Sequence, residues 1–216
     1  MVMGIGKVET APDPIGNEKK GISFRISSEY FEPAIDRNRV LRNYVSVWGK
    51  QAEKAAGLKV GDLVAIHGTL SIRKRDQEGQ KAESRSIIAQ AIYAADPAMP
   101  QYLTAIISGR VGGDPKTGTS NQGSQWASFS IATSRWDDRA KDYKSIWHSI
   151  RVFGDLVPPT LDEIFKGTLC CIEGTPYWSR DSRDEKVWHP IVIANAIFGC
   201  GRLSPIAAPP LSLIHI

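Results

Sequence analysis

Alternation of apolar and polar residues is the dominant pattern in this chain. It is clearest in the stretch Ser145-Ile-Trp-His-Ser-Ile-Arg-Val-Phe-Gly154. A period of two predicts a β-strand whose successive side chains point to opposite faces. The core-facing positions, apolar with one polar member, are Ile146, His148, Ile150 and Val152. The outward positions are Trp147, Ser149, Arg151 and Phe153.

The outward face of this strand carries two large aromatic rings with an arginine between them. A half-buried strand ordinarily places small polar or charged residues there. Flat π surfaces beside a cation suit an unpaired nucleic-acid strand, because every base has a face that can stack and every nucleotide has a phosphate to neutralise. The alternative is that Trp147 and Phe153 belong to a second packed layer, as in a β-sandwich.

Short alternating segments of this kind recur along the chain with turn-forming residues between them. In the second half, the predicted strands are residues 102–111, 125–133, 145–153, 168–178 and 188–198. Helices are expected only between the third and fourth strands of each half, at residues 51–56 and about 159–165. The polar segments 112–118 and 119–123 are expected to form mobile turns. This pattern predicts an all-β fold of five-stranded Greek-key barrels.

The chain contains an internal repeat. Val45-Ser-Val-Trp-Gly49 corresponds to Ile150-Arg-Val-Phe-Gly154, and Ile87-Ile-Ala-Gln-Ala-Ile-Tyr93 to Val192-Ile-Ala-Asn-Ala-Ile-Phe198. Two copies of one domain explain this correspondence. The predicted organisation is a first domain at 1–95, a proline-containing linker at 96–100, a second domain at 101–203 and a proline-rich tail at 204–216.

The tail matches no element of the repeat. Its final stretch, Leu211-Ser-Leu-Ile-His-Ile216, resembles the translation of an adaptor used in sequencing libraries. One hypothesis is that residues 211–216 are not native and that the natural C-terminus is missing. A genuine short apolar tail is the alternative.

Composition and charge narrow the possible functions. The 216 residues carry a net charge of only +4, so charge alone would bind duplex phosphates weakly. No apolar run reaches the ~20 residues that span a bilayer, and the N-terminus lacks a signal-peptide pattern, so we expect a cytoplasmic protein. Cysteines 170, 171 and 200 fit neither a disulfide framework nor a zinc site. We expect no metal and no cofactor.

Several motifs of the second copy together resemble bacterial single-stranded DNA-binding proteins (the SSB family). They are Gly109-Arg-Val, Phe129-Ser-Ile-Ala-Thr-Ser-Arg-Trp136, Trp147-His-Ser-Ile-Arg-Val-Phe-Gly154, Ile172-Glu-Gly174 and Tyr177-Trp-Ser-Arg180. The resemblance implies two tandem OB-folds, each with a short helix between strands three and four. It also implies sequence-independent binding of single-stranded DNA at the nucleoid, in replication, repair and recombination, without catalysis.

The resemblance assigns roles to residues of the second copy. Bases would stack on Trp136, Trp147, Phe153 and Trp178, and Arg151 and Arg180 would contact phosphates. Each stacked base contributes about 1–3 kcal/mol, so four rings could supply affinity that the small net charge cannot. The family has an arginine directly after Trp-His, whereas this chain has Ser149; Arg151 lies two places further on the same face.

The first copy matches the family less well. Its outward third-strand residues are Arg42, Tyr44, Ser46 and Trp48, of which we expect Arg42, Tyr44 and Trp48 to contact DNA. Tyr30 or Phe31 could replace Trp136. The hairpin tryptophan is lost, and Arg73, Lys74 and Arg75 are predicted to contact phosphates instead. The alternative for this basic run is an ordinary solvated hairpin tip.

The resembled family works with four OB domains, so two per chain suggest a homodimer, with His148 or its counterpart Asn43 expected at the subunit contact. The acidic C-terminal tip through which family members recruit proteins is not seen in this sequence. A protein–protein module of the primosome or recombination machinery is the alternative function. A nuclease or nucleotidyl transferase would need a carboxylate cluster or a lysine nucleophile motif, and the sequence analysis identifies neither.

Overall fold

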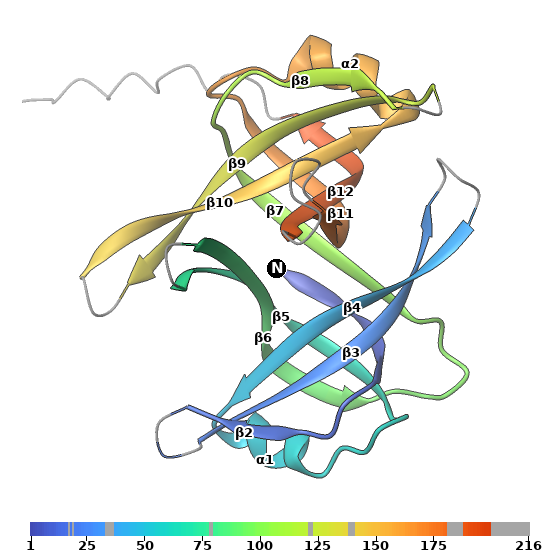
Figure 1. Ribbon diagram of the computed structural model, residues 1–216, viewed down its shortest axis with the longest axis vertical. Helices are drawn as coiled ribbons and strands as arrows, with labels where there is room; N and C mark the ends of the chain where they lie inside the picture. The colour runs from blue at the N-terminus through green and yellow to red at the C-terminus, as the bar shows by residue number, and fades with distance from the viewer. Residues whose placement is uncertain are drawn as a thin grey trace, which may run out of the picture.

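The computed structural model describes residues 1–16, 18, 20–32, 37–77, 80–120, 123–137, 141–180 and 188–199. Two β-barrels, one from each copy of the repeat, are stacked along the long axis of the molecule (Figure 1). The tail at 204–216, and with it the hypothesis about residues 211–216, lies outside the described residues. Among those residues, no helix is long and apolar enough to cross a membrane.

The first barrel contains β1 (Val2–Val8), β2 (Asp13–Ile15), β3 (Gly21–Glu32), β4 (Arg37–Trp48), α1 (Lys50–Ala56), β5 (Leu63–Gln77) and β6 (Gln80–Ala94). Antiparallel pairs join β1 to β3, β3 to β4, β6 to β5 and β5 to β1. One parallel pair, between β4 and β6, completes the circle. Five strands therefore close into a barrel, while β2 lies outside it along β3.

The second barrel repeats this plan with β7 (Tyr102–Val111), β8 (Lys116–Thr119), β9 (Gln125–Asp137), β10 (Asp142–Phe153), a short turn η3 (Gly154–Leu156), α2 (Val157–Glu163), β11 (Leu169–Arg180) and β12 (Trp188–Gly199). The circle closes through the same antiparallel pairs and a parallel β10–β12 pair. This strand order, with a helix between the third and fourth barrel strands, is the OB-fold. The prediction of two tandem OB-folds is confirmed.

Alternation also determines the cores. In β4, Val45 and Val47 are fully buried, and in β10, Ile150 and Val152 are buried in the same way. These branched side chains suit the pleated interior of a small barrel. The predicted core face of residues 145–153 is therefore confirmed.

Three details of the second barrel differ from the sequence prediction. The segment expected to be only turns contains β8, whose residues Lys116–Thr119 pair with β9. The sequence did not predict this edge strand, because neither of its faces is buried and its polar residues therefore show no alternation with apolar ones. The β9–β10 hairpin extends to the pair Asp137↔Asp142, beyond the apolar alternation, because backbone hydrogen bonds continue without core contacts. Helix α2 begins at Val157, since proline is tolerated in a first helical turn.

The barrels are joined edge to edge through β1 and β7. Antiparallel pairing from Val2↔Ala105 to Ile5↔Tyr102 merges both barrels into one twelve-stranded sheet. Gly4 permits this close approach, because a Cβ at that position would lie 2.2 Å from the Tyr102 carbonyl oxygen.

His148 and Asn43 are buried inside one chain, whereas the sequence analysis expected them at a contact between two chains. Only 5% of the His148 surface is exposed. Asn43 Oδ1 accepts a hydrogen bond of 2.9 Å from Arg85 Nη2, and Arg85 also reaches the second barrel. His148 lines a cavity together with Thr69 of the first barrel. The two equivalent residues thus lie at the internal junction between the copies.

Candidate nucleic-acid interface

The outward side of β10 presents the aromatic rings predicted from its alternation. Trp147 is 52% exposed, Ser149 is also exposed, and Arg151 and Phe153 are half-buried. The alternative that Trp147 belongs to a second packed layer is therefore wrong. Since β10 is held by β9 on one side and β12 on the other, the ring is displayed on a rigid support.

Trp147 lies against the backbone of Gly112, which follows β7. A Cβ added to Gly112 would lie only 2.3 Å from Cζ3 of the indole. The glycine therefore allows the ring to rest directly on the main chain, while about half of the Trp147 surface stays exposed. An aromatic group supported in this way is oriented before any ligand arrives, which lowers the entropic cost of binding.

Trp136 lies on the same face as Trp147 because of the strand register. Trp136 pairs with Tyr143, and Ala132 pairs with Trp147 across β9 and β10. Trp136 is 45% exposed and meets Tyr143 edge to face, with ring centroids 5.1 Å apart and planes at 70°. The sequence analysis missed Tyr143, because the hairpin was predicted to end before it. We call the outward rings of Trp136, Tyr143, Trp147 and Phe153 the aromatic face.

A polar pocket of about 590 Å³ lies beside the aromatic face. Arg151 Nη1 donates a hydrogen bond of 3.3 Å to Ser179 Oγ on β11. Burial lowers the pKa of Arg151, and Tyr177 opposes that effect. The other polar lining residues include Lys116, Ser128, Ser149 and His189. The side chains of Lys116 and Arg151 can donate to a phosphate group together with these hydroxyl groups, and the carboxylate of Asp114 offsets part of their positive charge.

Two other predicted residues of the second copy lie on the β11–β12 hairpin. Trp178 is half-buried, and the guanidinium of Arg85 from the first barrel lies over its ring, 4.9 Å from the centroid. Part of the proposed stacking surface of Trp178 is therefore already in contact with the protein. Arg180 ends β11, and its side chain lies outside those described.

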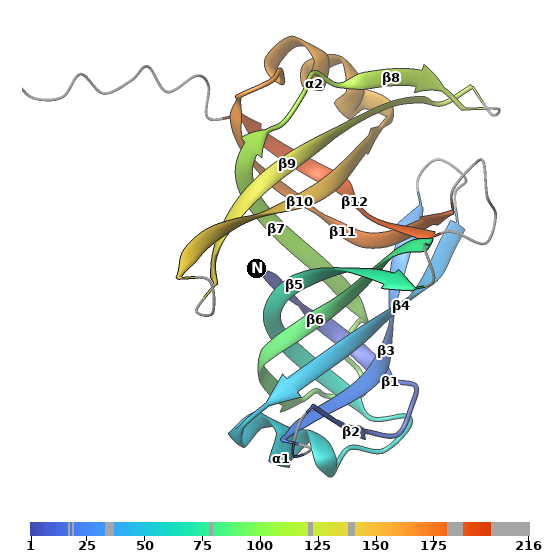
Figure 2. The ribbon, with the colours of Figure 1, turned by 60° about the vertical axis from the view of Figure 1, so that its left-hand side comes forward.

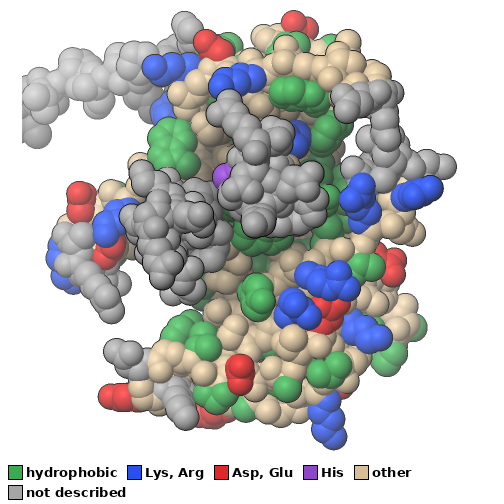
Figure 3. Space-filling model, in the orientation of Figure 1, with side chains coloured by type: hydrophobic (Ala, Val, Ile, Leu, Met, Phe, Trp, Pro, Cys, Tyr) green, Lys and Arg blue, Asp and Glu red, His purple; other side chains and the backbone are tan. Residues whose placement is uncertain are grey.

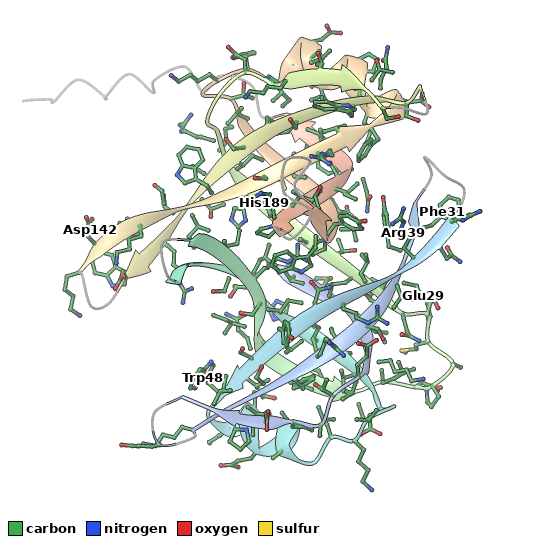
Figure 4. The ribbon with its side chains drawn as sticks, viewed as in Figure 1. Glu29, Phe31, Arg39, Trp48, Asp142 and His189 are labelled. Carbon is green, nitrogen blue, oxygen red and sulfur yellow. The ribbon has the colours of Figure 1, made fainter. Side chains whose placement is uncertain are left out.

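The first barrel has a sparser version of the aromatic face. Tyr44 and Trp48 are exposed on β4, and Trp48 rests on the backbone of Gly16 and Gly21. Phe31 is the better counterpart of Trp136, because it lies on the outward face of β3 while Tyr30 points to the other side. Figure 4 shows Phe31 and Trp48 at opposite ends of the β3–β4 ladder.

Arg42 is exposed, but its charge is not free. Its Nε lies 3.0 Å from both carboxylate oxygens of Glu9, and Arg25 Nε lies 3.0 Å from one of them. In Figure 3, blue side chains gather around a red one over β3 and β4. One carboxylate between two guanidinium groups leaves a net single positive charge, so Arg42 offers a phosphate less than an isolated cation would.

The basic hairpin residues Arg73, Lys74 and Arg75 lie on the outer part of β5, where they pair with Ser84, Glu83 and Ala82 of β6. Their side chains lie outside those described. Their contact with DNA therefore remains a prediction.

Sequence comparison matches the chain twice to one family model. The model of the single-strand binding protein family covers residues 5–95 and 103–197. The single-stranded DNA-binding proteins of Rickettsia felis and Rickettsia prowazekii are each 32% identical in an alignment of 98 residues that covers 42% of this chain. The match covers only 64% of the length of each relative.

Structural comparison gives the same fold. The wild-type single-stranded DNA-binding protein from Thermus aquaticus superposes with a TM-score of 0.76 at 19% identity, covering 96% of this chain and 95% of that one. A deletion mutant of the same Thermus protein gives a TM-score of 0.74 at 17% identity, covering 96% of this chain and 97% of that one. At these identities the superpositions establish the tandem fold, while the double match to the family model establishes kinship. The chain belongs to the single-strand binding protein family.

Proposed function

We propose that this protein binds single-stranded DNA without sequence preference and catalyses no reaction. The aromatic face of the second barrel carries the proposal: exposed rings on rigid strands, next to Arg151 and the polar pocket. Such rings stack on any base but need that base unpaired. Binding would keep a strand open and protected during replication, repair and recombination.

Strand preference tests this proposal most directly. A dT oligonucleotide should quench the tryptophan fluorescence, and a duplex of equal length should not, because paired bases hide their faces. Affinity should fall with salt only modestly, since the net charge is +4. Equal binding of duplex and single strand would contradict the proposal, and binding of neither would favour a protein-recruiting module.

The DNA-binding contribution of the first barrel is expected to be more electrostatic. Arg42, Tyr44 and Trp48 would contact the strand there, with Arg73, Lys74 and Arg75 on phosphates. Because Arg42 is paired with Glu9, we expect it to contribute less to DNA binding than its exposure alone would suggest.

We also propose that the protein is a homodimer with four OB domains. Strands β6, β5, β1, β7, β11 and β12 run side by side across both barrels. By register, Met3, Tyr93, Tyr102 and Phe198 lie on one outer side of these strands, which also carries charged residues such as Lys7 and Glu173. Tyr93 is 61% and Phe198 56% exposed. The exposed apolar residues of this six-stranded face are Met3, Tyr93, Tyr102 and Phe198. A large exposed apolar patch marks an association site, and a two-fold axis is the commonest way to pair identical faces.

Light scattering tests the dimer. The expected mass is twice 23.7 kDa, and replacing Tyr93 and Phe198 with glutamate should shift it to one chain mass, because charges would be buried unpaired at the interface. The matched change Val60→Glu, at an exposed apolar residue outside these strands, should leave the mass unchanged. A monomer at micromolar concentration in the unmodified protein would contradict the proposal.

A further inference from the structure

Arg85 of the first barrel is buried in contact with the second barrel. It lies on β6 and is only 3% exposed. Its Nη1 donates to the backbone carbonyl of Tyr177 at 2.8 Å and to that of Ile191 at 3.0 Å, while Nη2 donates to Asn43 Oδ1 at 2.9 Å. Its guanidinium also lies over the ring of Trp178. One side chain therefore ties β4 and β6 to the β11–β12 hairpin, whose reach toward them is visible in Figure 2.

The energetic setting of Arg85 indicates a specialised role. Burial lowers its pKa to about 9, so the guanidinium keeps its charge at neutral pH. Its described partners are two carbonyl groups, an amide oxygen and an indole face, rather than a carboxylate, and buried charges are costly without such compensation. Because Ile87 corresponds to Val192, the counterpart of Arg85 is Pro190, so the barrel fold itself does not require an arginine here.

A groove of about 300 Å³ opens beside Arg85, between β4 of the first barrel and β11 of the second. Its polar and aromatic lining residues are Arg39, Arg42, Arg85, Tyr177 and Trp178. Arg39 is exposed, and its Nη1 lies 3.5 Å from the Tyr177 hydroxyl oxygen. The volume is at the lower end of the ~300–1,000 Å³ typical of small-ligand sites, which suits one nucleotide.

The groove and the polar pocket of the second barrel are lined by consecutive residues of β11. Ser179 and Ile191 of the hairpin line the polar pocket with Arg151, whereas Tyr177 and Trp178 line the groove with Arg39. Residues of one strand, β11, therefore line both the pocket that holds Arg151 and the groove that contains Arg39 of β4.

We propose that this groove is a nucleotide-binding subsite that carries a single strand from one barrel to the other, an inference that rests on the proposed function. Trp178 stacks on the base with the ring surface that Arg85 leaves open. Arg39 contacts the neighbouring phosphate. Arg85 is a positioning residue, which fixes Trp178 and the hairpin against β4 so that residues of both barrels meet one nucleotide.

A double-mutant cycle between the two barrels tests this subsite. Arg39→Ala and Trp178→Ala should each weaken binding of a dT oligonucleotide of about 35 nucleotides by about tenfold, since OB-folds each cover about 4–16 nucleotides and this length spans both. If both residues hold the same nucleotide, the double variant should lose clearly less than the product of the single losses. Lys50→Ala, at an exposed position on α1 away from the groove, controls for the loss of one positive charge.

Arg85→Met tests the positioning role in the same titration. It should reduce affinity for the long oligonucleotide about as much as Trp178→Ala, yet leave binding of a dT oligonucleotide of about 8 nucleotides unchanged, because so short a strand is held by the aromatic face of one barrel. A destabilised but correctly folded variant would not show this length dependence. If Arg85→Met does not fold, the double-mutant cycle between Arg39 and Trp178 is sufficient to test the subsite.

The outcomes separate this inference from the proposed function. Multiplicative losses in the double variant, or no loss in either single variant, would overturn the subsite while oligonucleotide binding persists. If the unmodified protein binds no oligonucleotide, the proposed function fails first. A 5-iododeoxyuridine oligonucleotide should cross-link on irradiation to Tyr177 or Trp178, and cross-links confined to the aromatic face would also overturn the subsite.

Discussion

Replacing Trp147 with alanine is expected to weaken binding of a dT oligonucleotide by about 5- to 150-fold, which corresponds to the ~1–3 kcal/mol of one stacked base. The free energy of unfolding should change little, because Trp147 is 52% exposed and its ring contacts the backbone of Gly112 rather than the core. Fluorescence anisotropy of a labelled oligonucleotide and thermal unfolding measure the two quantities.

Gly112→Ala is the matched control, because it keeps the indole but moves it. The added Cβ would lie 2.3 Å from Cζ3 of Trp147, and the ring must tilt away from its support. We expect an affinity between those of the unmodified protein and Trp147→Ala. If Trp147→Ala unfolds the second barrel, or binds as tightly as the unmodified protein, Trp147 is not a stacking surface.

The parts of this fold that depend on local alternation could be predicted from the sequence. In residues 145–153 one side is buried in the barrel and the other is not, so the period of two predicted both the strand and the exposure of Trp147. The same reasoning failed for β8, because a polar edge strand has no buried side to give it a pattern. It also ended the β9–β10 hairpin before Tyr143, because strand pairing there no longer depends on apolar contacts.

Residues that meet only through the tertiary fold were beyond prediction. Glu9 lies 33 residues before Arg42, and Arg85 lies 92 residues before the carbonyl group it contacts at Tyr177. The sequence around Glu9 or Arg85 contains no local pattern that would identify the residue it contacts. The repeat offered a partial signal, since Arg85 stands where the second copy has Pro190. A charged residue that is present in only one copy of a repeat, where the other copy has an apolar one, can indicate a contact that the other copy does not make.

Asn43 and His148 occupy the same position in the two copies of the repeat, but their side chains differ in hydrogen bonding and in the ability to take up a proton. Asn43 accepts a hydrogen bond from Arg85 at 2.9 Å. His148 has no such arginine: its Nε2 lies 3.0 Å from Thr133 Oγ1, and its Nδ1 is buried without a hydrogen-bond partner among the described residues. Amide and imidazole groups are both neutral at pH 7, but only imidazole can take up a proton as the pH falls. The two junction sites should therefore differ in their response to acid.

Acid is expected to destabilise the protein through His148. Burial, with a smaller effect from the positively charged N-terminus, lowers the pKa of His148 from 6.5 to about 4. The unfolded chain therefore takes up this proton at a higher pH than the folded protein does. Stability should fall as the pH drops from about 6.5 to 4, by up to about 3 kcal/mol from this group alone.

The change His148→Asn isolates this effect, because it installs the residue that the first copy uses at the same position. The basic groups of Met1 and Arg135 line the same cavity, and no carboxylate of the described residues lines it to offset a proton taken up by His148. The free energy of unfolding, measured by urea titration from pH 7 to pH 4, should fall less steeply in the variant. Carboxylates titrate in both proteins and cancel in the comparison. Parallel curves for the two proteins would show that His148 takes up its proton as readily in the folded barrel as in the unfolded chain.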